Sequence, residues 1–102
     1  MDDTATRNEQ GIARGASGST TGDATVLTVT LGFRPQHVTI IDQTGPIRWE
    51  KIDGMLATQS LKTLAAGTTS LDTTSAIVIT ANGFTTSAAL NASTHVLNWF
   101  AK

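Results

Sequence analysis

The clearest alternation of apolar and polar residues falls in the middle of the chain. Residues 37–42, HVTIID, and residues 47–51, IRWEK, both alternate with a period of two, which is the side-chain period of a β-strand. Gly45 and Pro46 lie between them, and this pair favours a tight turn because glycine tolerates unusual φ angles and proline lacks an N–H. The pattern predicts a β-hairpin with Trp49 in the core of a small domain.

Shorter alternating segments predict further strands on both sides of this hairpin. Residues 55–66 are ambiguous, because their leucines also fit a short helix, and we favour a strand over 59–64. With turns every eight to twelve residues, the chain predicts roughly seven or eight strands and an all-β fold. We expect residues 24–102 to form one small β-sandwich or β-barrel, jelly-roll-like. The other predicted strands are 24–31, 70–72, 75–81, a short segment from Phe84, and 94–101.

Residues 1–23 differ from the rest of the chain, because Ile12 is their only large apolar residue besides the initial methionine. Gly, Ser, Thr and Ala dominate the second half of this segment. Such a composition buries too little apolar surface to offset the entropy of ordering. We expect a flexible N-terminal arm, or one that becomes ordered on a neighbouring subunit with Ile12 and Arg14 as contacts.

The last predicted strand, 94–101, is apolar on both faces. Leu97 and Trp99 alternate with Val96 and Phe100. A strand of this kind is either central in a sandwich or covered on one face by another subunit. Val96, Trp99 and Phe100 are therefore the residues that we expect at an oligomer interface.

The composition narrows the functional classes. Charged residues make up 15% of the 102 residues, below the roughly 25% of a typical soluble domain, and the formal net charge is −1. We expect no nucleic-acid partner, since no basic field is available to follow a phosphate backbone. The absence of cysteine excludes disulfides and cysteine-ligated zinc. No apolar run approaches the roughly 20 residues of a membrane span, and the polar segment MDDTATRNEQ predicts no export signal.

Catalytic and metal-binding patterns are weak in this sequence. His37 and His95 are the only histidines, too few for a zinc site without acidic ligands, and no GxSxG motif is present. The acidic residues fall at expected strand ends and turns. We expect no catalytic residue, metal or cofactor. One alternative is a carbohydrate-binding site on Trp49 and Trp99, although two strand tryptophans more often belong to a core.

Five short motifs occur in an unusual common order. They are Gly32-Phe33-Arg34-Pro35 before a strand, Trp49-Glu50, Gly54-Met55, Gly83-Phe84, and the aromatic pair Trp99-Phe100 in the last strand. In this order and spacing, residues 32–102 resemble a group of small structural proteins of tailed bacteriophages.

The resemblance implies a virion structural protein of the capsid decoration, or cement, type. Such a protein binds the outer surface of the phage head where subunits of the major capsid protein meet, commonly as a homotrimer, and stabilises the shell. It would be made in the host cytoplasm and used on the capsid surface. The N-terminal arm lies outside the resemblance; from its expected flexibility and its single isoleucine we predict that it contacts the capsid through Ile12 and Arg14. Alternatives are another virion component, such as a head-fibre base, tail or baseplate protein, or the carbohydrate-binding module.

Overall fold

The computed structural model describes residues 15–102, and all regular structure in this range is β-strand. Most of the strands coincide with segments predicted from the alternation of apolar residues. None of the described residues forms a helix long and apolar enough to cross a membrane. The nine strands are β1 (Ala16–Thr21), β2 (Leu27–Thr30), β3 (His37–Asp42), β4 (Ile47–Ile52), β5 (Ser60–Thr63), β6 (Thr69–Asp72), β7 (Ile77–Thr80), β8 (Gly83–Thr86) and β9 (Val96–Ala101).

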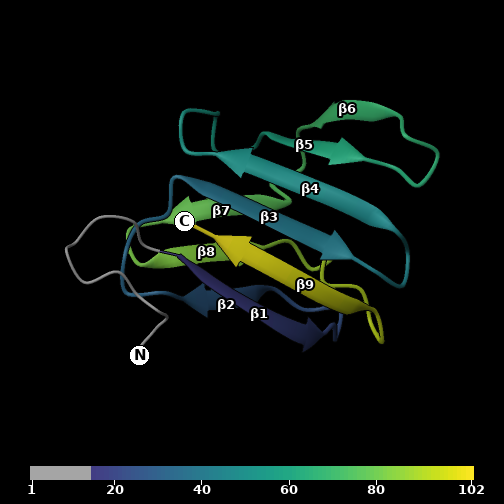
Figure 1. Ribbon diagram of the computed structural model, residues 1–102, viewed down its shortest axis with the longest axis horizontal. Helices are drawn as coiled ribbons and strands as arrows, with labels where there is room; N and C mark the ends of the chain where they lie inside the picture. The colour runs from purple at the N-terminus through teal and green to yellow at the C-terminus, as the bar shows by residue number, and fades with distance from the viewer. Residues whose placement is uncertain (1–14) are drawn as a thin grey trace.

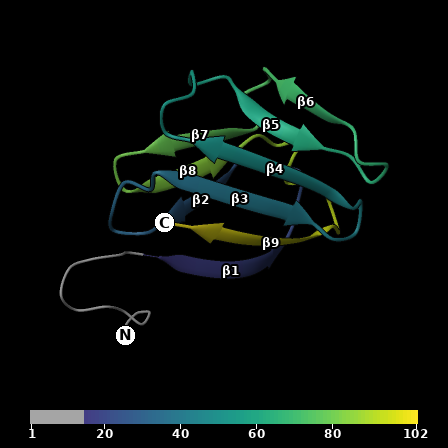
Figure 2. The same cartoon turned by 45° about the horizontal axis from the view of Figure 1, so that its top comes forward.

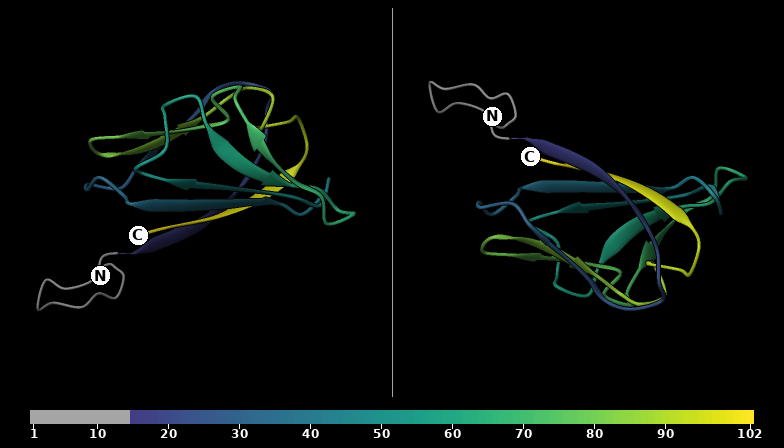
Figure 3. Two further views of the ribbon diagram at one scale, coloured as in Figure 1. Left: turned by 90° about the horizontal axis from the view of Figure 1, so that it is seen from above. Right: turned by 90° about the horizontal axis from the view of Figure 1, so that it is seen from below.

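The strands form two antiparallel sheets packed as a sandwich. The larger sheet has six strands in the order β1-β9-β3-β4-β5-β6, and the smaller has three in the order β2-β8-β7. Figures 1 and 2 show the smaller sheet lying against one face of the larger, and Figure 3 shows the two layers from above and below. The expected β-sandwich is confirmed. The alternative of a β-barrel is not, because the barrel is not closed and each sheet ends in edge strands among the described residues.

The core lies between the two sheets and follows from the alternation of each strand. Residues at every second position of β3, β4 and β9 point inward and are buried, or partly buried in the case of Ile47 and Trp99, whereas their neighbours in sequence point outward. Trp49 is only 6% exposed, so its predicted place in the core is confirmed. The buried apolar core residues are Val38, Ile40, Trp49, Ala76, Ile77, Ile79, Phe84, Leu90, Leu97 and Ala101.

Strand β1 corrects the predicted boundary between arm and domain. We expected residues 1–23 to be an arm, but Ala16–Thr21 pairs with β9 along its whole length, so the sandwich begins before residue 24. The residue that explains this strand is Gly18, although the glycines of this segment had suggested flexibility. Gly18 lies opposite Trp99, and a Cβ at this position would come within 2.6 Å of the indole ring. A strand without large side chains is therefore what the packing of Trp99 requires.

Several strand boundaries differ from the sequence prediction; the strands predicted over 75–81 and 94–101, for example, begin at Ile77 and Val96. The first predicted strand begins at Leu27 instead of Ala24, because Ala24 has a positive φ of 62°, which breaks the extended conformation. The turn assigned to Asn82-Gly83 lies one residue earlier, since Gly83 already pairs with Thr80 in the β7–β8 hairpin. The expected short strand over 70–72 and the preferred strand over 59–64 are both present, as β6 and β5.

Two phenylalanines allow a matched test of this core. Phe84 is fully buried and meets Trp99 edge to face, with ring centroids 5.5 Å apart, whereas Phe100 is 45% exposed on the other side of the sheet. Phe84→Ala should lower the free energy of unfolding by about 3–5 kcal/mol, because it removes a buried ring and leaves a cavity. Phe100→Ala should cost about 1 kcal/mol or less. Urea unfolding followed by tryptophan fluorescence measures both, and equal losses would contradict the assigned faces.

Candidate interaction surface

The larger sheet has one face that no described element covers. We call this the outer face; it consists of the side chains of β1, β9, β3, β4, β5 and β6 that point away from the smaller sheet, and it is turned toward the reader in Figure 1. The uncovered face of an antiparallel sheet is usually polar. Here five of the six strands each place one exposed large apolar residue on it. These residues are Phe100, Ile41, Ile52, Leu61 and Leu71.

The strand register shows how these residues are arranged. Phe100 on β9 lies opposite Thr39 on β3, which lies opposite Glu50 on β4. Glu50 in turn lies opposite Leu61 on β5, and Leu61 opposite Leu71 on β6. A single row across the sheet therefore has an aromatic residue near one end, a carboxylate in the middle and two leucines at the other end.

The centre of the outer face carries a cluster of polar groups. Arg48 and Glu50, two residues apart on β4, form an ion pair, and the Nε2 atom of His37 lies 4.0 Å from a carboxylate oxygen of Glu50. The Oγ1 atom of Thr39 lies 3.3 Å from the same Nε2 atom. Apolar residues on both sides of a charged centre are a composition typical of protein interfaces, in which aromatic residues and arginine are enriched.

The structure separates the residues that the sequence grouped as an oligomer interface. Val96 and Phe100 lie on the outer face, but Trp99 points inward and packs against the core. Trp99 therefore lies on the opposite face of the sheet from Val96 and Phe100. Ile12 and Arg14, the expected capsid contacts, lie outside the described residues.

Sequence reasoning missed four of the exposed apolar residues: Ile41, Ile52, Leu61 and Leu71. The signal was present for Ile41, because it occupies an outward position in a strand whose alternation was otherwise clear. An apolar residue at such a position breaks the pattern and marks the solvent face as a contact surface. For Leu61 and Leu71 the signal was weaker, because both strands are only four residues long.

Asp42 and His95 join two loops at one end of the larger sheet. The Nδ1 atom of His95 lies 2.6 Å from Oδ2 of Asp42, and the amides of Gly45 and Thr44 donate to Oδ1 at 2.8 and 3.0 Å. Burial raises the pKa of Asp42, but the hydrogen bonds from His95 and from the two amides outweigh burial and hold this pKa below its ordinary value of 3.8. The pair thus fixes the β3–β4 turn against the segment that leads into β9.

Because the pKa of Asp42 is lower in the folded chain than in the unfolded chain, its ionised form stabilises the fold. This contribution is complete above the ordinary value of 3.8 and is lost as the pH falls through the folded-state pKa. Asp42→Asn should lower the free energy of unfolding by about 1–3 kcal/mol at about pH 7, and by clearly less at about pH 2. Denaturant unfolding at both pH values measures this. Glu50→Gln on the outer face is the matched control, and an Asp42→Asn cost that is independent of pH would contradict the account.

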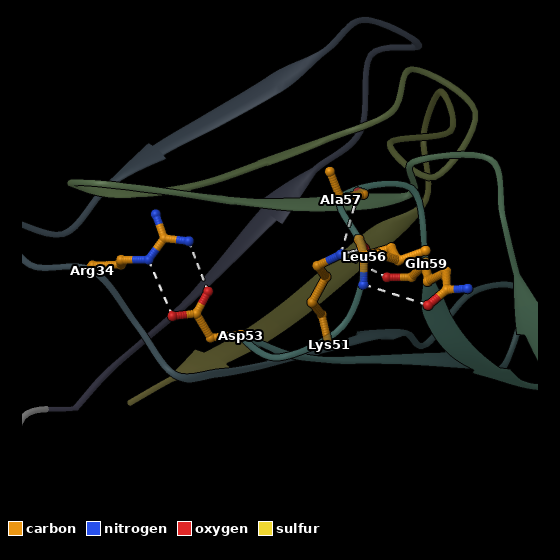
Figure 4. A network of polar contacts seen from close by, with 6 residues as sticks. All are labelled: Arg34, Lys51, Asp53, Leu56, Ala57 and Gln59. Atoms are coloured by element: carbon orange, nitrogen blue, oxygen red, sulfur yellow. Dashed lines mark hydrogen bonds and ion pairs between the residues drawn. The ribbon is translucent and has the colours of Figure 1, made fainter.

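Lys51 is a buried lysine that holds a loop. Its side chain points inward from β4, the residue is 2% exposed, and its ammonium group donates to the carbonyl oxygens of Leu56, Gln59 and Ala57 at 2.5, 2.7 and 3.2 Å (Figure 4). Three donors thus meet three acceptors, which is the full capacity of an ammonium group. Burial lowers the pKa of Lys51 below its ordinary value of 10.5, although the nearby Asp53 carboxylate acts in the opposite direction.

Arg34 holds the start of the same loop. Its Nη2 and Nε atoms donate to the two carboxylate oxygens of Asp53 at 2.7 and 3.1 Å, a two-pronged pair drawn in Figure 4. The guanidinium group lowers the pKa of Asp53 below its ordinary value, chiefly through this hydrogen bond. Because Arg34 belongs to the motif Gly32-Phe33-Arg34-Pro35 and Asp53 precedes Gly54-Met55, the contact joins two of the motifs found in the sequence.

Replacing Lys51 with methionine tests its role as a loop anchor. Lys51→Met should lower the free energy of unfolding by about 1–3 kcal/mol, because the carbonyl oxygens of residues 56, 57 and 59 lose their donor. Amide exchange of residues 55–59 should become faster. The matched control is Lys62→Met, which removes a lysine 5.7 Å from the centre of the Trp49 ring and should cost about 0.5–1 kcal/mol without freeing the loop. Unchanged exchange in Lys51→Met would contradict this role.

Other candidate chemistry is limited in the described part of the chain. Residues 15–102 contain no group of three or more His, Cys, Asp or Glu side chains placed to hold a metal ion. The two tryptophans considered for sugar binding do not form an exposed pair, since Trp49 is buried and Trp99 is partly buried against the core. Comparisons with protein-family models, with curated proteins and with solved structures gave no match. The outer face is therefore the feature on which we base a function.

Proposed function

We propose that this protein is a structural component of a tailed-phage virion, a capsid decoration protein that binds the outer surface of the head and stabilises its shell. The observation that carries the proposal is the outer face, with one exposed apolar residue on each of five neighbouring strands around the Arg48–Glu50 pair. The resemblance of residues 32–102 to small phage structural proteins supplies the class of partner, the major capsid protein.

The outer face suits this role physically. Covering Phe100, Ile41 and the leucines of β5 and β6 removes apolar surface from water, at about 25 cal/mol per Å². The charged groups of Arg48 and Glu50 would favour one orientation of the partner, because a partner in another position would cover them without complementary polar groups. A protein that binds the assembled shell more tightly than free capsid subunits shifts the equilibrium toward the closed shell by mass action. Many copies on one particle add to this effect.

The alternatives differ in how well the structure suits them. A head-fibre base, a tail protein or a baseplate protein would use the same outer face against a different virion partner. The carbohydrate-binding module is not favoured, because Trp49 is buried in the core and Trp99 is partly buried against it.

Binding to phage heads tests the proposal. The purified protein is mixed with heads from a phage that carries a disrupted copy of this gene, and the bound fraction is measured by co-sedimentation. We expect saturable binding and heads that withstand a higher temperature. A double variant, Ile41→Ser with Phe100→Ser, should bind at least about tenfold more weakly, because two apolar contacts at the interface are lost.

The matched control removes exposed apolar residues that lie elsewhere. Val26 is 61% exposed before β2, and Leu64 is 41% exposed after β5, so Val26→Ser with Leu64→Ser should bind like the unchanged protein. Absence of binding to heads, together with recovery on tails or baseplates, would move the assignment to another virion component. Equal loss in both double variants would contradict the role of the outer face.

A further inference from the structure

The two edges of the larger sheet present backbone groups that no described residue pairs with. In an antiparallel ladder, alternate residues direct their N–H and C=O groups toward the neighbouring strand and away from it. The amide of Gly22 donates to His95 O at 2.8 Å in the β1–β9 register, and the amide of Leu64 donates to Thr68 O at 3.0 Å in the β5–β6 register. These two bonds show which residues of β1 and β6 direct their backbone groups into the sheet and which direct them away from it. The residues whose backbone groups point outward are Ser17, Ser19 and Thr21 on β1, and Thr69 and Leu71 on β6.

Among the described residues no element covers either edge, and of the features that usually prevent strand addition only the short length of β6 and its Asp72 are present. Edge strands are commonly protected by lysine, proline, a bulge or a covering loop. Ala16–Thr21 has no charged residue and no proline, and Thr69–Asp72 has Asp72 as its single charge. Strand β6 is also exposed at Thr69, Ser70 and Leu71, so the folded chain gives it little burial on either face. Both edges are therefore open to pairing.

The two edges match one another in direction and in face. With six strands that are all antiparallel to their neighbours, β1 and β6 run in opposite directions. Strand β1 of a second copy placed beside β6 thus continues the antiparallel pattern. The residues of β1 and β6 whose backbone groups point away from the sheet edge also have their side chains on the outer face. Directly opposed residues of two paired strands have their side chains on the same face, so the two edges meet this condition. Two registers pair both outward residues of β6: one places Ser17 opposite Leu71 and Ser19 opposite Thr69, and the other places Ser19 opposite Leu71 and Thr21 opposite Thr69.

We propose that copies of this chain associate head to tail, with β1 of one copy added to β6 of the next. Such a contact uses two different surfaces, so it closes into a ring when the rotation between copies allows it, and a ring leaves neither edge unpaired. It also places the outer faces of all copies on the same side. The inference rests on the proposed function and deepens it by naming the surfaces through which copies of the chain associate. Val96 and Phe100 on the outer face then remain available for the capsid protein.

Cysteine pairing tests the contact, because the chain contains no cysteine of its own. The Cα atoms of a directly opposed, hydrogen-bonded pair lie about 5.5 Å apart, within the range that a disulfide spans. Ser19→Cys, Thr21→Cys and Thr69→Cys are prepared as separate full-length proteins. Each is oxidised alone, and each β1 variant is oxidised in an equal mixture with Thr69→Cys. We expect a covalent dimer from one of the two mixtures and from no variant alone. A dimer from a β1 variant alone would show β1 paired with β1, and absence of a dimer from both mixtures would equally overturn the proposal.

Proline variants test the same contact without a covalent bond. Thr69→Pro removes an N–H that points outward from β6 and leaves the ladder with β5 intact. Thr28→Pro is the matched control. The bond from the amide of Leu31 to Asn82 O fixes the β2–β8 alternation, so the N–H of Thr28 points outward from the edge of the smaller sheet.

Sedimentation equilibrium gives the mass of each protein. We expect an oligomer for the unchanged chain and for Thr28→Pro, and a monomer for Thr69→Pro. A monomeric unchanged chain, or an oligomer that survives Thr69→Pro, would overturn the head-to-tail contact. Binding of unchanged protein to phage heads in either case would leave the proposed function standing, whereas head-to-tail oligomers that bind no heads would overturn the function alone.

Discussion

The position of the Trp99 indole is the contact on which both sheets depend. The ring lies over Gly18 of β1, meets Phe84 of β8 edge to face, and comes from a residue paired with Ile40 of β3. The indole thus contacts the first strand and the opposite sheet, while the backbone of the same residue pairs with the neighbouring central strand. Because an aromatic ring of this size needs a large apolar surface around it, Gly18 and Phe84 are constrained together. The glycine-rich start of the chain becomes a strand for this reason.

The two faces of the larger sheet therefore have different roles. The inner face is closed by the apolar core, and two of its charged residues are held by hydrogen bonds: Asp42 accepts from His95 and two amides, and Lys51 donates to three carbonyl oxygens. These contacts fix loops and do not present chemistry to a ligand. The outer face keeps its apolar residues exposed, which costs free energy in water unless a partner covers them. The asymmetry places the proposed contact with the capsid on the outer face.

The sequence predicted the fold class and most strands because alternation with a period of two is a local signal. It predicted that Trp49 belongs to the core for the same reason. It failed for β1, since the packing of Gly18 against Trp99 joins residues 81 positions apart and leaves no local trace. At the candidate surface, Val96 and Phe100 were found because their strand is apolar on both faces. Trp99 was grouped with them although it points inward, and Leu61 and Leu71 meet only through a register that the sequence does not show.

The central claim is that the outer face of the larger sheet contacts the capsid surface. A cryo-electron microscopy reconstruction of phage particles assembled in the presence of this protein tests it most directly. The account predicts density for a sandwich of six and three strands on the outside of the head, with Phe100 and Ile41 against the capsid protein. Density for this fold in the tail, or on the head with the smaller sheet against the shell and the outer face in solvent, would contradict it.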